Sequence, residues 1–445
     1  MELKYIFSCY LYLIIQLVFV TARTAKYNNN CRILLDELKC FGNIVDFGGN
    51  AKYIKQLKLF DMTSNTLDFD FILEKYPHLE YLFIENGEIS TISPPKKNNS
   101  IKVLVLRNLG IERISQDFVL FFPYLEVLNL EQNLLSELSN EFHTGNLNEL
   151  YIENNHWNCS KDVKWALHLN TTGVARDLIK TTCKDKLYSK KSVLLIAQFK
   201  KDMEKTCTPT CMCSLERIFI DPNSNIQYPI IMVNCSGRNF SDLPVQLPAY
   251  TRILHLENNN IDNIKSLTTN PYYGHVWDLY MDNNSIESIS YLEGSYWISH
   301  FRIFSIRGNK LRELPSYALD NALMKNPNMP SGVTLFLGGN PWKCDCAFTP
   351  VFQELVLQKY SIQIRDLEDV KCSYIRGDEN SLKPINNLSR SSVCIASTDF
   401  SLQEGLDLLN AVLASLIIFI LGKLAYDYYH FKKSGKLPWI VSKIP

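Results

Sequence analysis

One spacing of apolar residues and asparagine recurs four times between Thr251 and Cys346. The apolar residues of each copy are expected to point inward from a short strand. The Asn lies where the chain leaves that strand, so its side chain can bond the backbone of the next coil. A coil of about 25 residues cannot close its own core, so such coils must stack to become stable. The copies are Leu254, Leu256, Asn259 and Ile261; Leu279, Met281, Asn284 and Ile286; Phe304, Ile306, Asn309 and Leu311; and Leu335, Leu337 and Asn340.

This spacing, LxxLxLxxNxL, is typical of leucine-rich repeats and predicts an α/β solenoid. Each inward Leu or Ile is expected to contribute roughly 1.5–3 kcal/mol by burial. A set of amphipathic helices is the alternative, but helices would not need an Asn at every return of the pattern. The same frame occurs earlier in the chain, where it is complete at Leu125, Leu128, Leu130 and Asn133, and again at Leu147, Leu150, Ile152 and Asn155. Before these two copies, around Leu79 and Ile101, the Asn is missing or displaced by one residue.

The thirteen cysteines indicate an exported chain. Residues 1–22 hold an apolar run behind Lys4 and end in small residues, which predicts a signal peptide; an uncleaved signal anchor is the alternative. Its removal would take Cys9 and leave an even number of cysteines, as expected in an oxidising compartment. Seven glycosylation sequons agree with export: Asn98, Asn158, Asn170, Asn234, Asn239, Asn283 and Asn387.

Cysteine clusters predict caps that close two repeat blocks, at residues 23–206 and 207–395. Cys31 and Cys40 flank an expected apolar core of Ile33, Leu34, Leu35 and Leu38 at the start of the first block. Cys159 and Cys183, with Trp157 and Trp165, suggest a terminal cap reduced to one disulfide. The second block opens with Cys207, Cys211, Cys213 and Cys235 and ends with Cys344, Cys346, Cys372 and Cys394. Zinc ligation is the alternative for such cysteines, but no His stands at ligand spacing.

Residues 408–425 form the other long apolar run, which as a helix would span roughly 27 Å, close to the thickness of a bilayer core. An expected stalk, residues 396–407, precedes this run, and a tail of 426–445 follows it. Four lysines lie on the tail side, so we expect the tail to be cytoplasmic and the repeats to face outward. A buried helix is the alternative, but the run has no polar face.

The sequence contains no pattern that indicates catalysis or cofactor binding. HExxH, GxSxG and P-loop motifs are absent, and no pair of carboxylates or histidines has catalytic or metal-ligand spacing. Lys plus Arg and Asp plus Glu are both 46, so no net charge would attract nucleic acid. We therefore expect no enzyme activity, no cofactor, no metal site and no nucleic-acid partner.

Two capped repeat blocks, one span and a short tail resemble the large class of extracellular leucine-rich-repeat membrane proteins. Within that class, residues 292–297 (LEGSYW), residues 317–323 (YALDNAL) and above all residues 412–445 (VLASLIIFILGKLAYDYYHFKKSGKLPWIVSKIP) resemble the insect halfway, or singed wings, family. The resemblance covers residues 207–445, whereas residues 23–206 match only as generic repeats. It implies a developmental cell-surface protein linked to ecdysone-driven moulting and metamorphosis.

Resemblance to the caps of such proteins also implies how their cysteines pair, since spacing alone does not fix connectivity. For the second block it implies the pairs Cys207–Cys213, Cys211–Cys235, Cys344–Cys372 and Cys346–Cys394. In the first block, where each cap is expected to hold one disulfide, we expect Cys31–Cys40 and Cys159–Cys183.

The residues between the inward leucines are expected on the concave side, where stacked strands usually bind ligands. In the second block they combine aromatic and Arg residues, which suits protein contact. They are Arg252, His255, Glu257, Trp277, Tyr280, Asp282, Arg302, Ser305, Arg307 and Phe336. The first block is more acidic: Glu80, Glu85, Glu126, Glu131, Glu149 and Glu153 stand against Lys102 and Arg107. A charged face can also be merely solvated.

These features predict a receptor or co-receptor that binds an extracellular protein. The short tail cannot hold a folded signalling domain, so signalling would need a co-receptor, clustering or control of ligand availability. The alternative is a homophilic adhesion or matrix-organising protein that uses the same faces.

Overall fold

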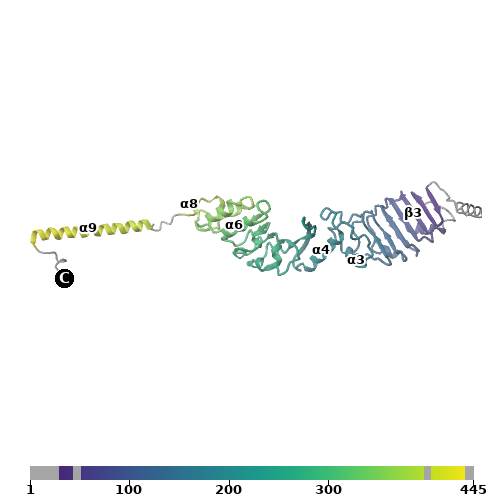
Figure 1. Cartoon of the computed structure of the whole chain (residues 1–445), viewed down its shortest axis with the longest axis horizontal. Coiled ribbons are helices and arrows are strands. Elements are labelled where there is room, and N and C mark those ends of the chain that lie inside the picture. Colours follow the sequence, from purple (N-terminus) through teal and green to yellow (C-terminus); the bar gives the residue numbers. More distant parts are fainter. Residues whose placement is uncertain (1–29, 44–51, 395–401, 436–445) are drawn as a thin grey trace, which may run out of the picture.

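The computed structural model describes residues 30–43, 52–394 and 402–435. Within them the chain is an α/β leucine-rich-repeat solenoid in two blocks with disulfide-closed caps, followed by one long apolar helix, which confirms the predicted fold class (Figure 1). The expected signal peptide, residues 396–401 of the expected stalk and residues 436–445 of the tail lie outside the described residues.

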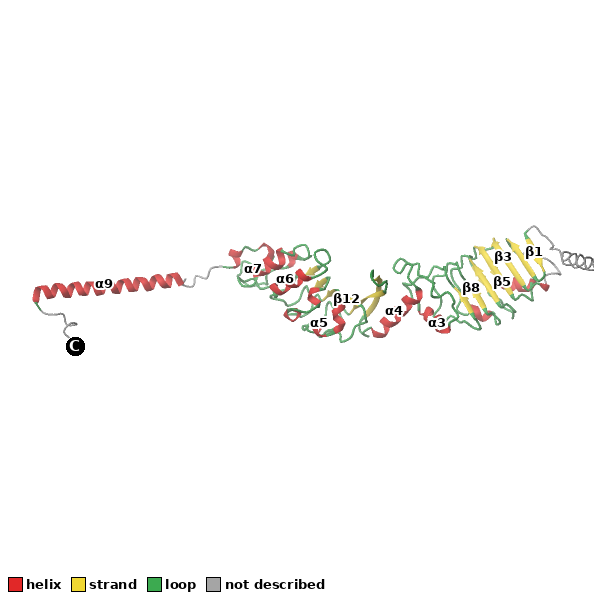
Figure 2. Cartoon of the chain, in the orientation of Figure 1, coloured by secondary structure: helices red, strands yellow, loops and turns green. Residues whose placement is uncertain are grey.

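The first block is built on a seven-stranded sheet whose strands lie side by side in chain order (Figure 2). Its opening pair is antiparallel and every later pair is parallel, with Leu57, Leu82, Leu104, Leu128 and Leu150 in register. These leucines are completely buried, so the sheet carries the core on its inner face. The strands are β1 (Cys31–Leu34), β2 (Glu37–Phe41), β3 (Gln56–Met62), β5 (Tyr81–Gly87), β7 (Val103–Arg107), β8 (Val127–Asn129) and β9 (Glu149–Tyr151); β4 (Thr66–Asp68) and β6 (Thr91–Ser93) form a separate pair.

The second block has a six-stranded sheet of the same kind. A long antiparallel hairpin opens it, and Leu254, Leu279, Phe304 and Leu335 then stand in register on four parallel strands. The strands are β10 (Met212–Ile220), β11 (Gln227–Asn234), β12 (Thr251–His255), β13 (Asp278–Tyr280), β14 (Ile303–Ser305) and β15 (Thr334–Phe336).

Short helices return the chain between strands and close the ends of the blocks. Most of them span one or two turns. The α-helices are α2 (Phe69–Lys75), α3 (Lys164–Thr172), α4 (Val193–Thr206), α5 (Ser266–Thr269), α6 (Ser316–Lys325), α7 (Thr349–Phe352), α8 (Arg390–Val393) and α9 (Leu402–Ser434); the other turns are η2 (Phe118–Phe121), η3 (Pro271–His275), η4 (Ser290–Leu292), η5 (Trp297–Ser299), η6 (Gln353–Gln358), η7 (Leu367–Asp369) and η8 (Ile385–Asn387).

A buried Asn binds each regular coil to its neighbour. The Asn284 amide nitrogen donates to the Met281 carbonyl of its own turn and to the Leu256 carbonyl one coil earlier, while its Oδ1 accepts from the Ile261 amide. Five other asparagines repeat this arrangement, so each satisfies backbone groups that would otherwise be buried without partners. They are Asn133, Asn155, Asn259, Asn309 and Asn340.

The irregular coils of the first block have no ladder Asn of their own. The Leu109 and Ile111 amides donate to the Asn133 side chain of the next coil, whereas the coil before them uses backbone groups. Gly87 and Leu109 stand at the ladder position, and the Gly87 and Ile89 amides donate to carbonyls of the next coil. The displaced asparagines, Asn86 and Asn108, sit one residue earlier with positive φ. Their side chains bond one another at 2.9 Å on the surface. The asparagines displaced by one residue therefore bond each other instead of the backbone, and the strand register is preserved.

The amino-terminal cap differs from the expectation at two residues. Cys31 and Cys40 are paired directly across the β1–β2 hairpin and joined by a disulfide. Leu38 is completely buried, but Leu34 and Leu35 are exposed by 53% and 70%. The prediction that they form the cap core is wrong because they lie at the hairpin turn, where Leu35 has a φ of 57°.

The two carboxy-terminal caps share one plan. Asn155, Trp157 and Cys159 have the spacing of Asn340, Trp342 and Cys344, and both tryptophans are buried. The Cys159–Cys183 and Cys344–Cys372 disulfides therefore occupy equivalent places. The second cap adds Cys346–Cys394, and the amino-terminal cap of that block holds Cys207–Cys213 and Cys211–Cys235.

A lysine replaces the missing disulfide of the first cap. Lys161 stands where the second cap has Cys346. Lys200 reaches over from α4 and its Nζ donates to the carbonyls of Cys159 at 2.8 Å and Lys161 at 2.7 Å. Burial lowers the pKa of Lys200. We call this contact the Lys200 clamp, because an ammonium group ties the segment that a second sulfur bridge ties elsewhere.

The two blocks are in contact through this cap. Helix α4 packs against β10, and the hydroxyl of Tyr188 donates to the Leu215 carbonyl of that strand. Tyr188 is buried, and this burial raises the pKa of Tyr188 to about 12. The buried side chains of both blocks form one continuous cluster.

Helix α9 is longer than the predicted span of 408–425. It begins at Leu402, inside the expected stalk, and continues to Ser434. The apolar run marks the membrane-compatible part but not the helix ends, since the polar residues on both sides also favour helix. Gly405–Ser434 is the one stretch within the described residues that is long and apolar enough to cross a membrane.

The Lys200 clamp leads to a stability prediction. Lys200→Met keeps most of the apolar stem but leaves the carbonyls without their charged donor, so we expect the free energy of unfolding to fall by about 2 kcal/mol. Urea unfolding followed by tryptophan fluorescence would measure the loss. Trp157 and Trp165 report on this cap, with ring centroids 4.7 Å apart. Lys201→Met, at an exposed neighbouring position, is the control. Equal unfolding midpoints for the two variants would contradict a stabilising clamp.

Candidate functional site

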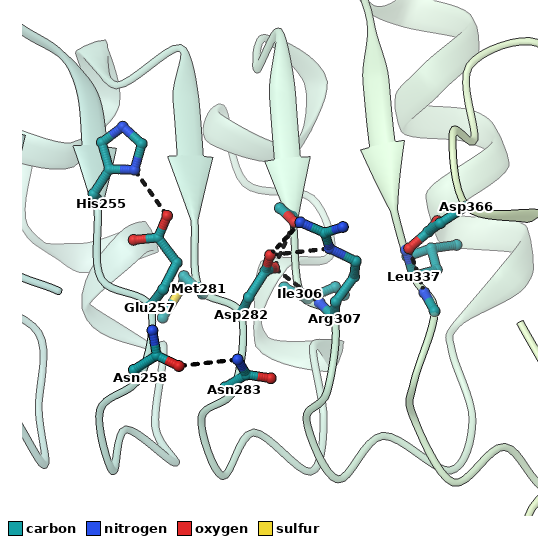
Figure 3. A network of polar contacts seen from close by, with 12 residues as sticks. His255, Glu257, Asn258, Met281, Asp282, Asn283, Ile306, Arg307, Leu337 and Asp366 are labelled. Atoms are coloured by element: carbon teal, nitrogen blue, oxygen red, sulfur yellow. Dashed lines mark hydrogen bonds and ion pairs between the residues drawn. The ribbon is translucent and has the colours of Figure 1, made fainter. Parts of the chain in front are cut away.

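Polar and aromatic side chains form three rows across the concave face of the second block. Each row runs across successive strands, because side chains on a strand alternate between the core and the surface. Leu254, Leu279 and Leu335 point into the core, and the residues beside them face outward. Part of this surface is shown in Figure 3.

The first row is a tryptophan held between two guanidinium groups. The Arg252 Cζ lies 4.8 Å and the Arg302 Cζ 5.8 Å from the Trp277 ring centroid. Arg302 also pairs with both carboxylate oxygens of Asp278, a side chain only 4% exposed. This hydrogen bonding raises the pKa of Arg302, whereas burial lowers that of Arg252. Trp277 is therefore fixed from both sides before any partner arrives.

The second row consists of stacked rings. His255 and Tyr280 are parallel, with ring centroids 4.5 Å apart. Burial raises the pKa of the Tyr280 hydroxyl, so this group stays protonated at neutral pH and can donate a hydrogen bond. Farther along, the Arg307 Cζ lies 4.9 Å from the Phe336 ring.

The third row consists of two charged pairs on neighbouring coils (Figure 3). The His255 Nδ1 lies 2.8 Å from a Glu257 carboxylate oxygen. The Ser236 hydroxyl donates to the other oxygen. Asp282 accepts from the Arg307 Nε and from the Arg307 amide, both at 3.0 Å. Burial opposes ionisation of Glu257, but the bonds from His255 and Ser236 outweigh it and the pKa of Glu257 is lowered. Both carboxylates of this row are thus already partnered within the chain.

The structure brings the sequence-predicted face together and divides its residues into two groups. Trp277, Tyr280, Arg302, Arg307 and Phe336 keep accessible surface. Asp282 and Ser305 do not, because they are buried beneath the face and bonded to one another. The expectation that they face a ligand is corrected: they support the surface.

Sequence reasoning missed Asp278 and Ser236. Asp278 follows Trp277 at a strand position where the regular pattern allows any residue, and Ser236 belongs to the preceding cap. An Asp one coil before Arg302 is the one signal that could have indicated this pairing, since neighbouring coils place such residues opposite each other.

The acidic face of the first block is partly neutralised. Glu80 lies between Lys102, at 2.8 Å, and Lys55, at 3.5 Å, and the Lys102 hydrogen bond lowers the pKa of Glu80. The Arg176 Nε lies 3.8 Å from Glu149, which also accepts from the Tyr151 hydroxyl at 2.9 Å. Fewer of the six glutamates therefore carry an uncompensated negative charge than the sequence suggests.

The expected glycosylation sites differ in exposure. Asn98, Asn170, Asn239, Asn283 and Asn387 are exposed, whereas Asn158 and Asn234 are half-buried. The Asn283 amide nitrogen donates to Asn258 at 2.9 Å, at the edge of the concave face (Figure 3). Occupancy of these sites stays a prediction.

Comparison with known proteins identifies the family. A family model described as the Halfway C-terminal domain matches residues 406–443. Protein singed wings 2 of Drosophila melanogaster is 34% identical over 429 residues, which cover 92% of this chain and 84% of that protein. This chain belongs to the singed wings 2 and halfway family. Protein halfway of Drosophila pseudoobscura pseudoobscura is 28% identical over 87% of this chain and 64% of its own, so the chain spans slightly less than two thirds of that relative.

The resemblance inferred from residues 412–445 is thereby confirmed. Among solved structures, the Toll–Spatzle complex aligns with a TM-score of 0.37 and 19% identity, over 77% of this chain and 46% of that one. So low a likeness carries no argument about function. Membership of the singed wings 2 and halfway family, together with the two repeat sheets and α9, makes this chain a receptor-like leucine-rich-repeat protein. Its described residues contain one candidate membrane span.

Pairing beneath the face leads to a second prediction. Asp278→Ala leaves the Arg302 guanidinium without its carboxylate and loosens one side of Trp277, so we expect the free energy of unfolding to fall by about 2 kcal/mol. Glu287→Ala, which removes an exposed carboxylate on the same coil, should change it by less than about 0.5 kcal/mol. Urea unfolding of both variants measures these free energies. A similar decrease in each would mean that the Asp278–Arg302 pair does not stabilise the fold.

Proposed function

We propose that this chain is a cell-surface receptor or co-receptor that binds an extracellular protein through the concave face of its second block. The observation that carries the proposal is the packing of Trp277 between Arg252 and Arg302, above the buried carboxylate of Asp278. Trp, Tyr and Arg dominate binding energy at protein interfaces. Here they lie together on a rigid strand surface.

Pre-ordering of these side chains favours affinity. Immobilising a flexible side chain at an interface costs about 0.5–1.5 kcal/mol. Trp277, Tyr280 and Arg307 are already held by ring contacts or ion pairs in the free chain. A partner would therefore pay little of this ordering cost, and the face differs in this respect from a surface of loosely solvated charges.

The proposed placement is the plasma membrane, in a single-pass type I orientation with an extracellular amino terminus. Six disulfides in the described residues suit an oxidising compartment. Lys432 and Lys433 in the last turn of α9 favour a cytoplasmic carboxy-terminal side. The domain boundaries, the signal peptide and occupancy of the seven sequons belong to the same proposal.

Signalling would pass through a partner. We propose that the chain works with a signalling co-receptor or controls ligand availability. Similarity to the singed wings 2 and halfway family supports a role in insect development, for which ecdysone-linked moulting and metamorphosis is our specific proposal. We propose no enzyme activity, no cofactor and no nucleic-acid partner.

Binding through the concave face is testable with a double variant. Trp277→Ala with Tyr280→Ala removes both aromatic anchors, so we expect the affinity for the partner to fall by more than about 2 kcal/mol, roughly thirtyfold. The partner would first be captured with the soluble repeat region, and affinities would then be measured by surface plasmon resonance. Tyr291→Ala with Tyr317→Ala, at exposed positions outside the strands, is the matched control. Unchanged binding of the aromatic variant would move the site elsewhere.

The receptor and adhesion proposals separate in a cell assay. If the chain is a receptor, cells that express it should stay dispersed, while its soluble repeat region should bind cells that do not express it. Homophilic adhesion predicts clustering of expressing cells that is lost with the Trp277 and Tyr280 variant. Counting aggregates against untransfected cells measures the difference, and clustering would overturn the receptor proposal.

A further inference from the structure

Three carboxylates converge at the carboxy-terminal end of the first block. Glu131, Glu153 and Asp177 lie in one row on neighbouring coils, as the pairing of β8 with β9 and of Leu150 with Ala175 places them. One carboxylate oxygen from each residue lies within 4.8 Å of an oxygen from both others. Within the described residues, no Lys, Arg or His forms an ion pair with any of the three.

Asp177 is the buried member of this cluster and has an oxygen without a partner. Only 6% of the residue is exposed. Its Oδ2 accepts from the backbone amides of Ile152 at 2.7 Å and Glu153 at 2.5 Å. Its Oδ1 is also shielded from solvent but accepts no hydrogen bond. A buried acceptor without a donor is costly unless another group satisfies it.

Electrostatics make this arrangement more costly. Burial raises the pKa of Asp177, and the nearby Glu131 charge raises it further. Glu131 is itself held in place, because the Asn129 side chain donates to its Oε2 at 2.8 Å. The Glu153 side chain has no hydrogen bond or ion pair within the described residues. Negative charge thus gathers around a buried carboxylate, and within the described residues no cationic side chain pairs with it.

The second block shows that the structural role of Asp177 does not require the glutamates. Asp366 caps the last strand there in the same way, accepting from the amides of Leu337 at 2.9 Å and Gly338 at 2.8 Å (Figure 3). Each of its oxygens has one donor. The row beside it contains Gly338 and Arg307 in place of carboxylates, and Arg307 pairs with Asp282. The first block therefore has two additional carboxylates, Glu131 and Glu153, and one Asp177 oxygen without a donor. Capping of the strand requires none of these features.

We propose that Glu131, Glu153 and Asp177 form a binding site for Ca²⁺. Calcium binds oxygen ligands at 2.3–2.6 Å, so two oxygens on one ion lie at most about 5 Å apart, which the spacing of this cluster meets. Its coordination tolerates irregular geometry and completes itself with water. The site has no His or free thiolate, which disfavours zinc and copper. Sites in extracellular modules bind at about 10⁻⁴–10⁻³ M, so the inference relies on the proposed outward placement of the repeats but not on any protein ligand.

The test uses the full-length chain in detergent micelles, freed of metal with EDTA. Adding 2 mM CaCl₂ should raise the unfolding midpoint by roughly 2–4 °C, and ⁴⁵Ca²⁺ equilibrium dialysis should give one site. Glu131→Gln with Glu153→Gln should weaken Ca²⁺ binding at least tenfold. Glu85→Gln with Glu126→Gln removes the same charge from the same block outside the cluster, and should leave binding unchanged.

The metal-free midpoints give a second readout that a merely structural role would not produce. Without metal, the Glu131 and Glu153 variant should melt above the wild type, because the repulsion around Asp177 is relieved. The proposal is overturned if the wild type binds no Ca²⁺ up to 5 mM, if the cluster variant binds as the wild type does, or if that variant melts lower in EDTA.

Discussion

This structure depends on the hydrogen bonds that the Asn side chain at the turn of each regular coil makes to backbone groups. Asn309 illustrates them: its amide nitrogen binds carbonyls of its own turn and of the preceding coil, and its Oδ1 accepts from the Ile286 amide. Because one side chain joins two coils, it fixes the register of neighbouring strands. The rows of the concave face exist only because that register is constant. A shift of one residue would place Trp277 and Tyr280 in the core and the leucines outside.

Most of the solenoid was predictable because its determinants are periodic. Leu279, Met281 and Asn284 are placed by a spacing that repeats in the sequence, and the structure buries all three. Leu34 and Leu35 were misassigned because apolar character alone cannot tell a hairpin turn from a core. The Lys200 clamp was also invisible to pattern reasoning, since it joins residues about forty positions apart that have no common motif.

The sequence predicted which residues share the concave face, but not which of their side chains pair with each other. Alternation along a strand placed Trp277, Tyr280 and Arg307 on one face. It could not show that Asp282 would be drawn under Arg307, because burial of a carboxylate depends on which cation lies one coil away. For the same reason the zero net charge of the chain is a poor guide to its surface. On the concave face of the second block Glu257, Asp278 and Asp282 each face a His or Arg partner. Within the described residues, the acids at the end of the first block have no such partner.

The contact between Tyr188 and Leu215 has a consequence for any partner that touches both blocks. With α4 packed on β10 and the buried side chains continuous across the junction, the two concave faces are held at a set separation and angle. A flexible tether would accept many arrangements and lose entropy on choosing one. A packed junction fixes the arrangement during folding. A partner with two binding sites of matching separation would therefore gain avidity, whereas a partner with a different separation could bind only one face.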